Sequence, residues 1–186
     1  MSESNAKPFK AHTQAFVSLL PGAAKRSQSV TADWQYSGSL IDGVTIKEVR
    51  NVVKAEGCLV EIFRRDWMPH AGDVDQVFQL LLPPGAISAW HVHTVTTDRL
   101  FASRGTVKIV LYDNRPDSPT RSQINEFRFG AARPALVGVP PGVWHGVQNI
   151  GRDDAVLVNV TDKAYDYADP DHWSVPSDTD DIPYRF

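Results

Sequence analysis

Cysteine is almost absent from this chain, which has Cys58 as its one cysteine among 186 residues. A lone cysteine excludes an internal disulfide and is typical of a reducing compartment. Cys58 itself begins an apolar segment, so we expect it to be a small core residue. Long apolar runs are missing too, since none reaches the roughly 18 residues that span a membrane. The opening MSESNAKPFKAHTQ also lacks the layout of a signal peptide. We therefore expect a cytoplasmic protein without a membrane partner.

Strong charge of either sign is also lacking. Lysine and arginine number 19 and aspartate and glutamate 22, which leaves a formal net charge of -3. Basic residues come at most in isolated pairs such as Arg64-Arg65. A nucleic-acid surface needs clustered basic side chains, so we expect no nucleic-acid partner. The 42% of apolar residues and the chain length instead suit one globular domain with an additional tail.

Three regions differ in their patterns. Residues 1–40 form a weakly patterned arm, in which 11–20 could make a short helix that stops at Pro21-Gly22. Residues 41–161 are expected to form the core. Residues 162–186 combine seven aspartates with several aromatic residues. We expect this C-terminal segment to lie across the core and to be pinned there by its aromatic side chains.

The core region consists of short segments rich in β-branched and aromatic residues, with turn residues between them. In residues 106–113, for example, Val107, Ile109 and Leu111 share one face, which is the period of a strand, and the other face carries Thr106, Lys108 and Tyr112. Helical periodicity is almost missing. We therefore predict an all-β antiparallel sandwich or barrel, with its first strands at 44–50, 58–64 and 76–82.

Two histidines one residue apart, His91 and His93, lie between Gly85 and Gly105 and are followed by Asp98. Successive side chains of a strand alternate between its faces, so the two imidazoles should point the same way, about 7 Å apart. Asp98 follows at an odd separation and can join them only if the chain turns. The polar residues 94–97 have the length of a hairpin loop.

A second stretch, PPGVWHGVQN, carries His145 and must belong to another strand. A single buried histidine is usually a hydrogen-bonded core residue. Four candidate ligands beside turn signals instead favour a divalent metal site inside the barrel, formed by His91, His93, Asp98 and His145. Trp90 precedes a ligand histidine and should face away from the metal.

These two stretches resemble the two cupin signatures. The first fits G-x5-H-x-H-x4-E-x6-G with Asp98 in place of glutamate, and the second fits P-x-G-x2-H-x3-N, although Pro134 replaces a glycine expected upstream. The resemblance implies a double-stranded β-helix, the jelly-roll barrel of the cupins. It also implies that the four predicted ligands bind Fe, Mn, Ni, Zn or Cu.

A wider resemblance covers residues 40–186. The runs GCLVEIFR, SRGTVKIVLYDNRPDSPT, PPGVWHGV and DPDHW resemble the dTDP-4-dehydrorhamnose 3,5-epimerase family. The resemblance implies that His91 is the base that removes the proton beside a ketone. It further implies that His145 is the second-motif histidine, that Glu61 contacts the nucleotide, and that the chain forms a homodimer by strand exchange.

Three positions depart from that family. The family's substrate-contacting lysine corresponds to Asp98, and one of its arginines corresponds to Glu56. The tyrosine that serves as its general acid falls near Val158. In the family the lysine would stabilise the oxyanion and the tyrosine would donate the proton. Their loss points to a divergent member with a metal site. The hydroxyls that could replace the tyrosine belong to Tyr112, Tyr165 and Tyr167.

The leading functional hypothesis is a metal-dependent enzyme that acts beside the carbonyl of a small, oxygen-rich substrate such as a carbohydrate derivative. His91 and His145 would be catalytic, and Glu61, Tyr112 and Tyr165 would contact the substrate. Three alternatives stay open: epimerisation of a dTDP-4-dehydro-6-deoxy sugar with His91 as base, Fe(II)-dependent dioxygenation, and non-catalytic binding of sugar or metal. Cupins host many chemistries, so the fold by itself cannot choose among these.

Overall fold

The chain forms two compact units, Met1–Gly38 and Ser39–Phe186. The computed structural model describes residues 18–26, 28–33, 35–67 and 73–186. In the first unit an isolated bridge pairs Val30 with Tyr36. Most of the helix predicted at 11–20 lies outside the described residues, and 18–20 are not helical. Within the described part of the chain, no helix has the length and apolar character that a membrane span requires.

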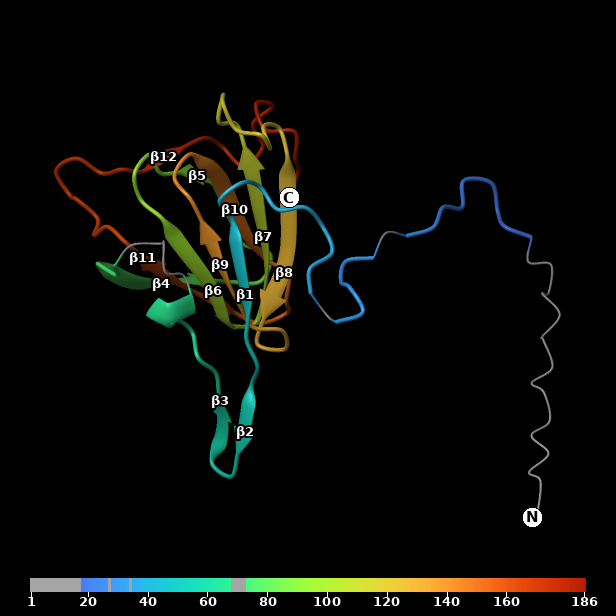
Figure 1. The fold of residues 1–186 in the computed structure, drawn as a ribbon, viewed down its shortest axis with the longest axis horizontal. Helices are drawn as coiled ribbons and strands as arrows, with labels where there is room; N and C mark the ends of the chain where they lie inside the picture. Colours follow the sequence, from blue (N-terminus) through green and yellow to red (C-terminus); the bar gives the residue numbers. More distant parts are fainter. Residues whose placement is uncertain (1–17, 27, 34, 68–72) are drawn as a thin grey trace, which may run out of the picture. The chain divides into compact units, whose positions relative to one another are not determined.

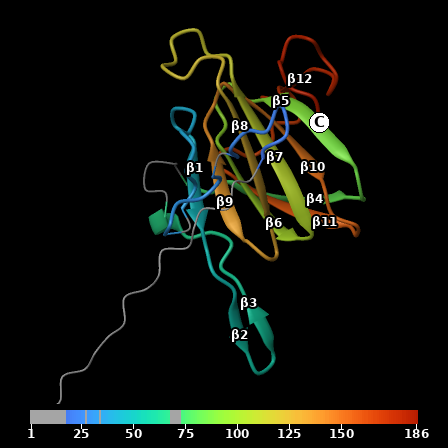
Figure 2. The same ribbon diagram turned by 90° about the vertical axis from the view of Figure 1, so that its right-hand side faces the viewer.

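The second unit contains two five-stranded antiparallel sheets, which form the jelly roll that the sequence predicts (Figures 1 and 2). The first sheet has the order β1-β9-β6-β11-β4. Its strands are β1 (Thr45–Glu48), β9 (Ala135–Val139), β6 (Asp98–Arg104), β11 (Ala155–Thr161) and β4 (Gln76–Leu82).

The second sheet has the order β12-β5-β10-β7-β8. Its strands are β12 (Trp173–Ser174), β5 (Ile87–Val92), β10 (Val143–Asn149), β7 (Thr106–Asp113) and β8 (Ile124–Gly130). Strand β10 pairs with β5 through His145 and His91, and with β7 along its whole length. The two motif histidines of β5 and β10 are therefore neighbours in one sheet.

The C-terminal segment packs on the outer face of this second sheet. Trp90 is fully buried there, with the ring centroids of Tyr184 and Phe186 at 6.0 and 5.0 Å from its own. Lys108 completes the cover with its Nζ 5.1 Å from the Phe186 ring centroid. The predicted pinning by aromatic residues therefore rests on Tyr184 and Phe186, and the prediction that Trp90 faces away from the motif histidines is confirmed.

The strand predicted at 58–64 is wrong beyond its first residues. Strand β3 (Gly57–Leu59) ends early and pairs with β2 (Val52–Lys54) in a hairpin that projects from the barrel in Figures 1 and 2, and Cys58 is exposed there rather than in the core. A single 3-10 turn, η1 (Arg65–Trp67), follows. The apolar residues from 60 to 63 pack against buried Phe101 and Leu136. Their apolar character reflects this packing and not a strand.

The turn after β5 is also not a hairpin. Strand β5 belongs to the second sheet and β6 to the first, so residues 93–97 carry the chain from one sheet to the other. This crossing places His93, at the end of β5, opposite Asp98, the first residue of β6. The histidine and the carboxylate can thus approach each other across the barrel.

Candidate functional site

A cavity of about 440 Å³ opens into the barrel and is lined by both sheets and the C-terminal segment. Four histidines face it: His91, His93, His145 and His172. Four aspartates also contribute to the lining, and Lys163 is the one lysine or arginine among the described residues that do so. Histidine and carboxylate side chains therefore supply most of the titratable groups of the cavity.

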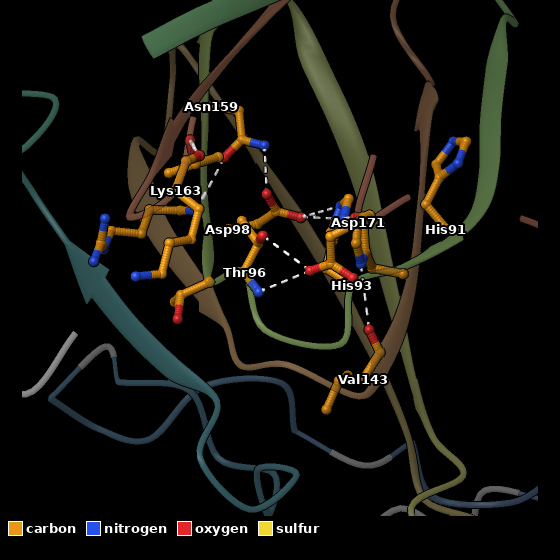
Figure 3. Close-up of polar contacts among 12 residues, drawn as sticks. His91, His93, Thr96, Asp98, Val143, Asn159, Lys163 and Asp171 are labelled. Atoms are coloured by element: carbon orange, nitrogen blue, oxygen red, sulfur yellow. Dashed lines mark hydrogen bonds and ion pairs between the residues drawn. The ribbon is translucent and has the colours of Figure 1, made fainter. Parts of the chain in front are cut away.

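Three of the four predicted metal ligands form one cluster. Asp98 Oδ2 lies 3.2 Å from Nε2 of His93 and 3.1 Å from Nε2 of His145, and the ligand atoms of all three residues lie within 4.8 Å of one another. The other oxygen, Asp98 Oδ1, accepts a hydrogen bond from Nδ2 of Asn159 at 2.8 Å. Figure 3 shows Asp98 at the centre of these contacts. The three side chains come from both sheets, as the crossing of residues 93–97 requires.

The remaining ring nitrogens of the cluster face backbone carbonyls. Nδ1 of His93 contacts the carbonyl oxygen of Asp171, and Nδ1 of His145 lies 3.3 Å from that of Val143. A carbonyl oxygen can only accept a hydrogen bond, so each contact is a hydrogen bond in the tautomer that carries its proton on Nδ1. Each Nε2 is thereby left facing the Asp98 carboxylate.

Electrostatics follow from this arrangement. Burial alone would raise the pKa of Asp98, but hydrogen bonds and charge from His145 and His93 hold that pKa well below its usual range. Burial likewise opposes the charged form of His93, but the hydrogen bond and charge of Asp98 raise the pKa of His93 overall. The cluster therefore keeps an ionised carboxylate deep in the barrel.

His91 stays outside the cluster. Its Nε2 lies 3.1 Å from the hydroxyl oxygen of Ser88, and its ring centroid is 4.8 Å from that of His172. In Figure 3 its ring lies apart from the contacts around Asp98. Burial, followed by the nearby histidines, lowers the pKa of His91 to about 4, so the ring is neutral at pH 7. The structure thus separates a neutral imidazole from the three-residue cluster.

Asp171 and His172 reach the site from the C-terminal segment, and the sequence patterns did not single them out. The Asp171 carboxylate accepts hydrogen bonds from the backbone N–H groups of Thr94, Val95 and Thr96 and from both threonine hydroxyls. Its carbonyl also contacts His93, which precedes the same loop. The only signal in the sequence was the run DPDHW. No short-range spacing links this run to Thr94 or His93, which precede Asp171 by 77 and 78 positions.

Of the three residues predicted to contact the substrate, one lines the cavity and two do not. Tyr165 lines the cavity. Tyr112 does not, because it packs with Trp90 and Ile182 beneath the C-terminal segment. Glu61 also lies outside the cavity lining and forms an exposed ion pair with Arg64 at 3.4 Å. Only Tyr165 of the three therefore keeps its predicted place.

We expect Asp171→Ala to destabilise the protein by about 1.5–3 kcal/mol, because several donors of the 94–96 loop lose a charged acceptor. Urea unfolding followed by circular dichroism measures this difference. Asp178→Ala, an exposed aspartate of the same segment, is the matched control and should stay within about 0.5 kcal/mol of wild type. Equal effects of the two variants would show that the Asp171 contacts do not hold the loop.

Comparisons with known proteins agree with one another. Residues 39–182 match the family model of dTDP-4-dehydrorhamnose 3,5-epimerase. The chain is 33% identical over 139 residues to the "Probable low-salt glycan biosynthesis epimerase Agl13" of Haloferax volcanii, which covers 74% of this chain and 89% of the relative. It is 30% identical over 149 residues to the spore coat polysaccharide biosynthesis protein SpsL of Bacillus subtilis, covering 79% and 97%.

A solved structure with the same fold is that of a dTDP sugar isomerase from Desulfovibrio desulfuricans. The two structures superpose with a TM-score of 0.72 at 26% sequence identity, over 77% of this chain and 90% of that one. The matched family region begins at Ser39, where the second compact unit also begins. The similarity therefore belongs to the barrel and its C-terminal segment.

Proposed function

The chain belongs to the dTDP-4-dehydrorhamnose 3,5-epimerase family, and on that premise we propose that it epimerises a dTDP-4-keto-6-deoxy sugar. The observation that carries the proposal is the position of His91. By the sequence resemblance this residue falls at the position of the family's base, and it lines the cavity beside Ser88, outside the three-residue cluster. Both curated relatives are named for glycan or polysaccharide biosynthesis, which supports a sugar nucleotide as the substrate.

The proposed reaction inverts a carbon beside the sugar ketone. His91 accepts the proton of that carbon through a ring nitrogen, and the electrons of the broken C–H bond move into the carbonyl to form an enolate. A proton then returns to the same carbon from the opposite face, which restores the ketone with the inverted configuration. Ser88, 3.1 Å from Nε2 of His91, orients the ring for the first step.

The returning proton needs a donor, because no hydroxyl occupies the family tyrosine position near Val158. Of the three tyrosines suggested by the sequence, Tyr165 lines the cavity, Tyr112 is buried elsewhere, and Tyr167 is 88% exposed and outside the lining. We assign the donor role to Tyr165. The negative charge of the enolate also needs a positive partner in place of the family lysine, whose position is held by Asp98.

Incubation of the enzyme with dTDP-4-keto-6-deoxyglucose in D₂O tests the proposed reaction. We expect deuterium to enter beside the ketone, together with formation of an epimer, as followed by mass spectrometry and proton NMR. Boiled enzyme is the control for spontaneous exchange. Tight binding of the nucleotide sugar without exchange above this control would contradict the proposal and favour a binding protein.

Dioxygenation and homodimerisation remain predictions from the sequence. Fe(II)-dependent dioxygenation rests on the donor set of His93, Asp98 and His145 alone, and the family similarity adds no support for it. The homodimer also stays a prediction. Gel filtration with light scattering would decide the oligomeric state.

A further inference from the structure

We propose that His93, Asp98 and His145 bind one divalent first-row transition-metal ion, and that His91 stays outside its coordination sphere. The proposal goes beyond the epimerase reaction, since the ion can bind whether or not the chain inverts a sugar. Its support comes from the geometry around Asp98.

Three donor atoms converge on one small space. Nε2 of His93 and Nε2 of His145 lie 3.2 and 3.1 Å from Asp98 Oδ2. The ligand atoms of the three residues all lie within 4.8 Å of one another, so a single ion can contact all three at once.

Two imidazole nitrogens and one carboxylate oxygen suit first-row divalent ions and leave positions for water or substrate. Asp98 is 2% exposed and His145 is 6% exposed, so bulk water competes little for their side chains. All three residues also line the cavity. The arrangement therefore offers both a closed protein side and an accessible ligand side.

Outer contacts orient the three ligands. Metal-binding histidines usually donate their second N–H to a carbonyl or carboxylate, and metal-binding carboxylates are usually hydrogen-bonded as well. Each cluster residue has such a contact: the Asp171 carbonyl for His93, the Val143 carbonyl for His145, and the Asn159 amide for Asp98. The three ligands are thus held in place from separate parts of the chain.

His91 is excluded for a geometric reason. Its Nε2 is already close to the Ser88 hydroxyl, and its Nδ1 is a buried atom outside the group of mutually close ligand atoms. The structure therefore divides the four residues of the sequence motif into three metal ligands and one free imidazole. A metal in the cluster would supply the positive charge that the family lysine supplies elsewhere.

Metal binding is tested without any substrate. The purified protein is stripped with EDTA, dialysed and titrated with Zn²⁺ by calorimetry and with Co²⁺ by visible absorption. We expect one equivalent per chain and the absorption bands of Co²⁺ bound to protein nitrogen and oxygen. No binding of either ion by the wild-type protein overturns the proposal.

The ligand assignment is tested with His93→Gln, Asp98→Asn and His145→Gln, which keep polar groups of similar size. Loss of outer-shell partners alone typically costs 10–100-fold in affinity, so loss of a direct ligand should cost more than about 100-fold. His91→Gln is the matched control and should bind within about threefold of wild type. An equal loss in His91→Gln would overturn the three-ligand site in favour of four ligands.

Circular dichroism checks that each variant folds. Should any of the three ligand variants unfold, Co²⁺ spectra of wild type and His91→Gln decide the question, since identical spectra require the same ligands in both. Different spectra would place His91 in the coordination sphere. Because these measurements need no turnover, failure of the epimerase proposal leaves their outcome unaffected.

Discussion

Replacing His91 with asparagine is expected to lower kcat for epimerisation by about 10²–10⁴-fold, the usual contribution of a positioned general base. Asparagine keeps a polar side chain but cannot accept the proton from the substrate carbon. The KM should change little, because the lost interaction forms mainly in the transition state. Steady-state rates with dTDP-4-keto-6-deoxyglucose, together with deuterium exchange at the same carbon, measure the effect.

The control for this variant is Ser88→Ala, which removes the hydroxyl 3.1 Å from the His91 ring and keeps the imidazole. If Ser88 orients the base, we expect a smaller loss in kcat than for His91→Asn. Thermal unfolding of both variants should match wild type closely, since neither replacement empties the core. A fully active His91→Asn protein would remove His91 from the mechanism and leave the cluster around Asp98 as the reactive centre.

Replacing Trp90 with alanine is expected to lower the free energy of unfolding by about 3–5 kcal/mol, the range for a buried aromatic residue. Trp90 is fully buried and contacts both Tyr184 and Phe186, so the variant leaves a cavity beneath the C-terminal segment. Urea unfolding by fluorescence or circular dichroism measures the change. The remaining stability would be small, since domains of this size are stabilised by only about 5–15 kcal/mol.

Trp173→Ala is the matched control, because Trp173 is the same residue type on the same sheet but is 61% exposed. Its loss should cost less than about 1 kcal/mol. Limited proteolysis adds a local readout: Trp90→Ala should be cut faster than wild type within residues 175–186, and Trp173→Ala should not. Equal stability losses in the two variants would show that the aromatic contacts of Trp90 do not anchor the segment.

Trp90 also links stability to the site. It lies next to His91 on β5, and β12 pairs with β5 at Val92 and His91. The C-terminal segment that covers Trp90 therefore also carries Asp171 and His172 to the cavity. Packing on the outer face of the sheet thus helps to place the residues on its inner face.

Several features of the protein depended on neighbours in the chain and could be predicted from the sequence. The alternation of residues 106–113 identified a strand, and the glycines and prolines between such segments marked the turns of an all-β barrel. The short separation of His91, His93 and Asp98 in the chain placed all three side chains in one region, although the hairpin predicted between them is a crossing from one sheet to the other. Each of these inferences needed only local periodicity.

Local periodicity could also mislead. The apolar residues 60–63 look like a strand, but they pack on Phe101 and Leu136 without pairing. Tyr112 has the alternation of a polar, outward position, yet the C-terminal segment covers it. In both cases a distant part of the chain decides whether an apolar or aromatic side chain pairs, packs or faces solvent.

The sequence by itself determined the fold class and the residues of the motif, because both follow from spacings of a few residues. The tertiary structure decided how the motif divides, with His93, Asp98 and His145 in one cluster and His91 beside Ser88. That division depends on residues 93–97 crossing between two sheets and on the contact of Asp171 with His93 across 78 positions. Such contacts form only when the whole barrel closes, so no local pattern can contain them.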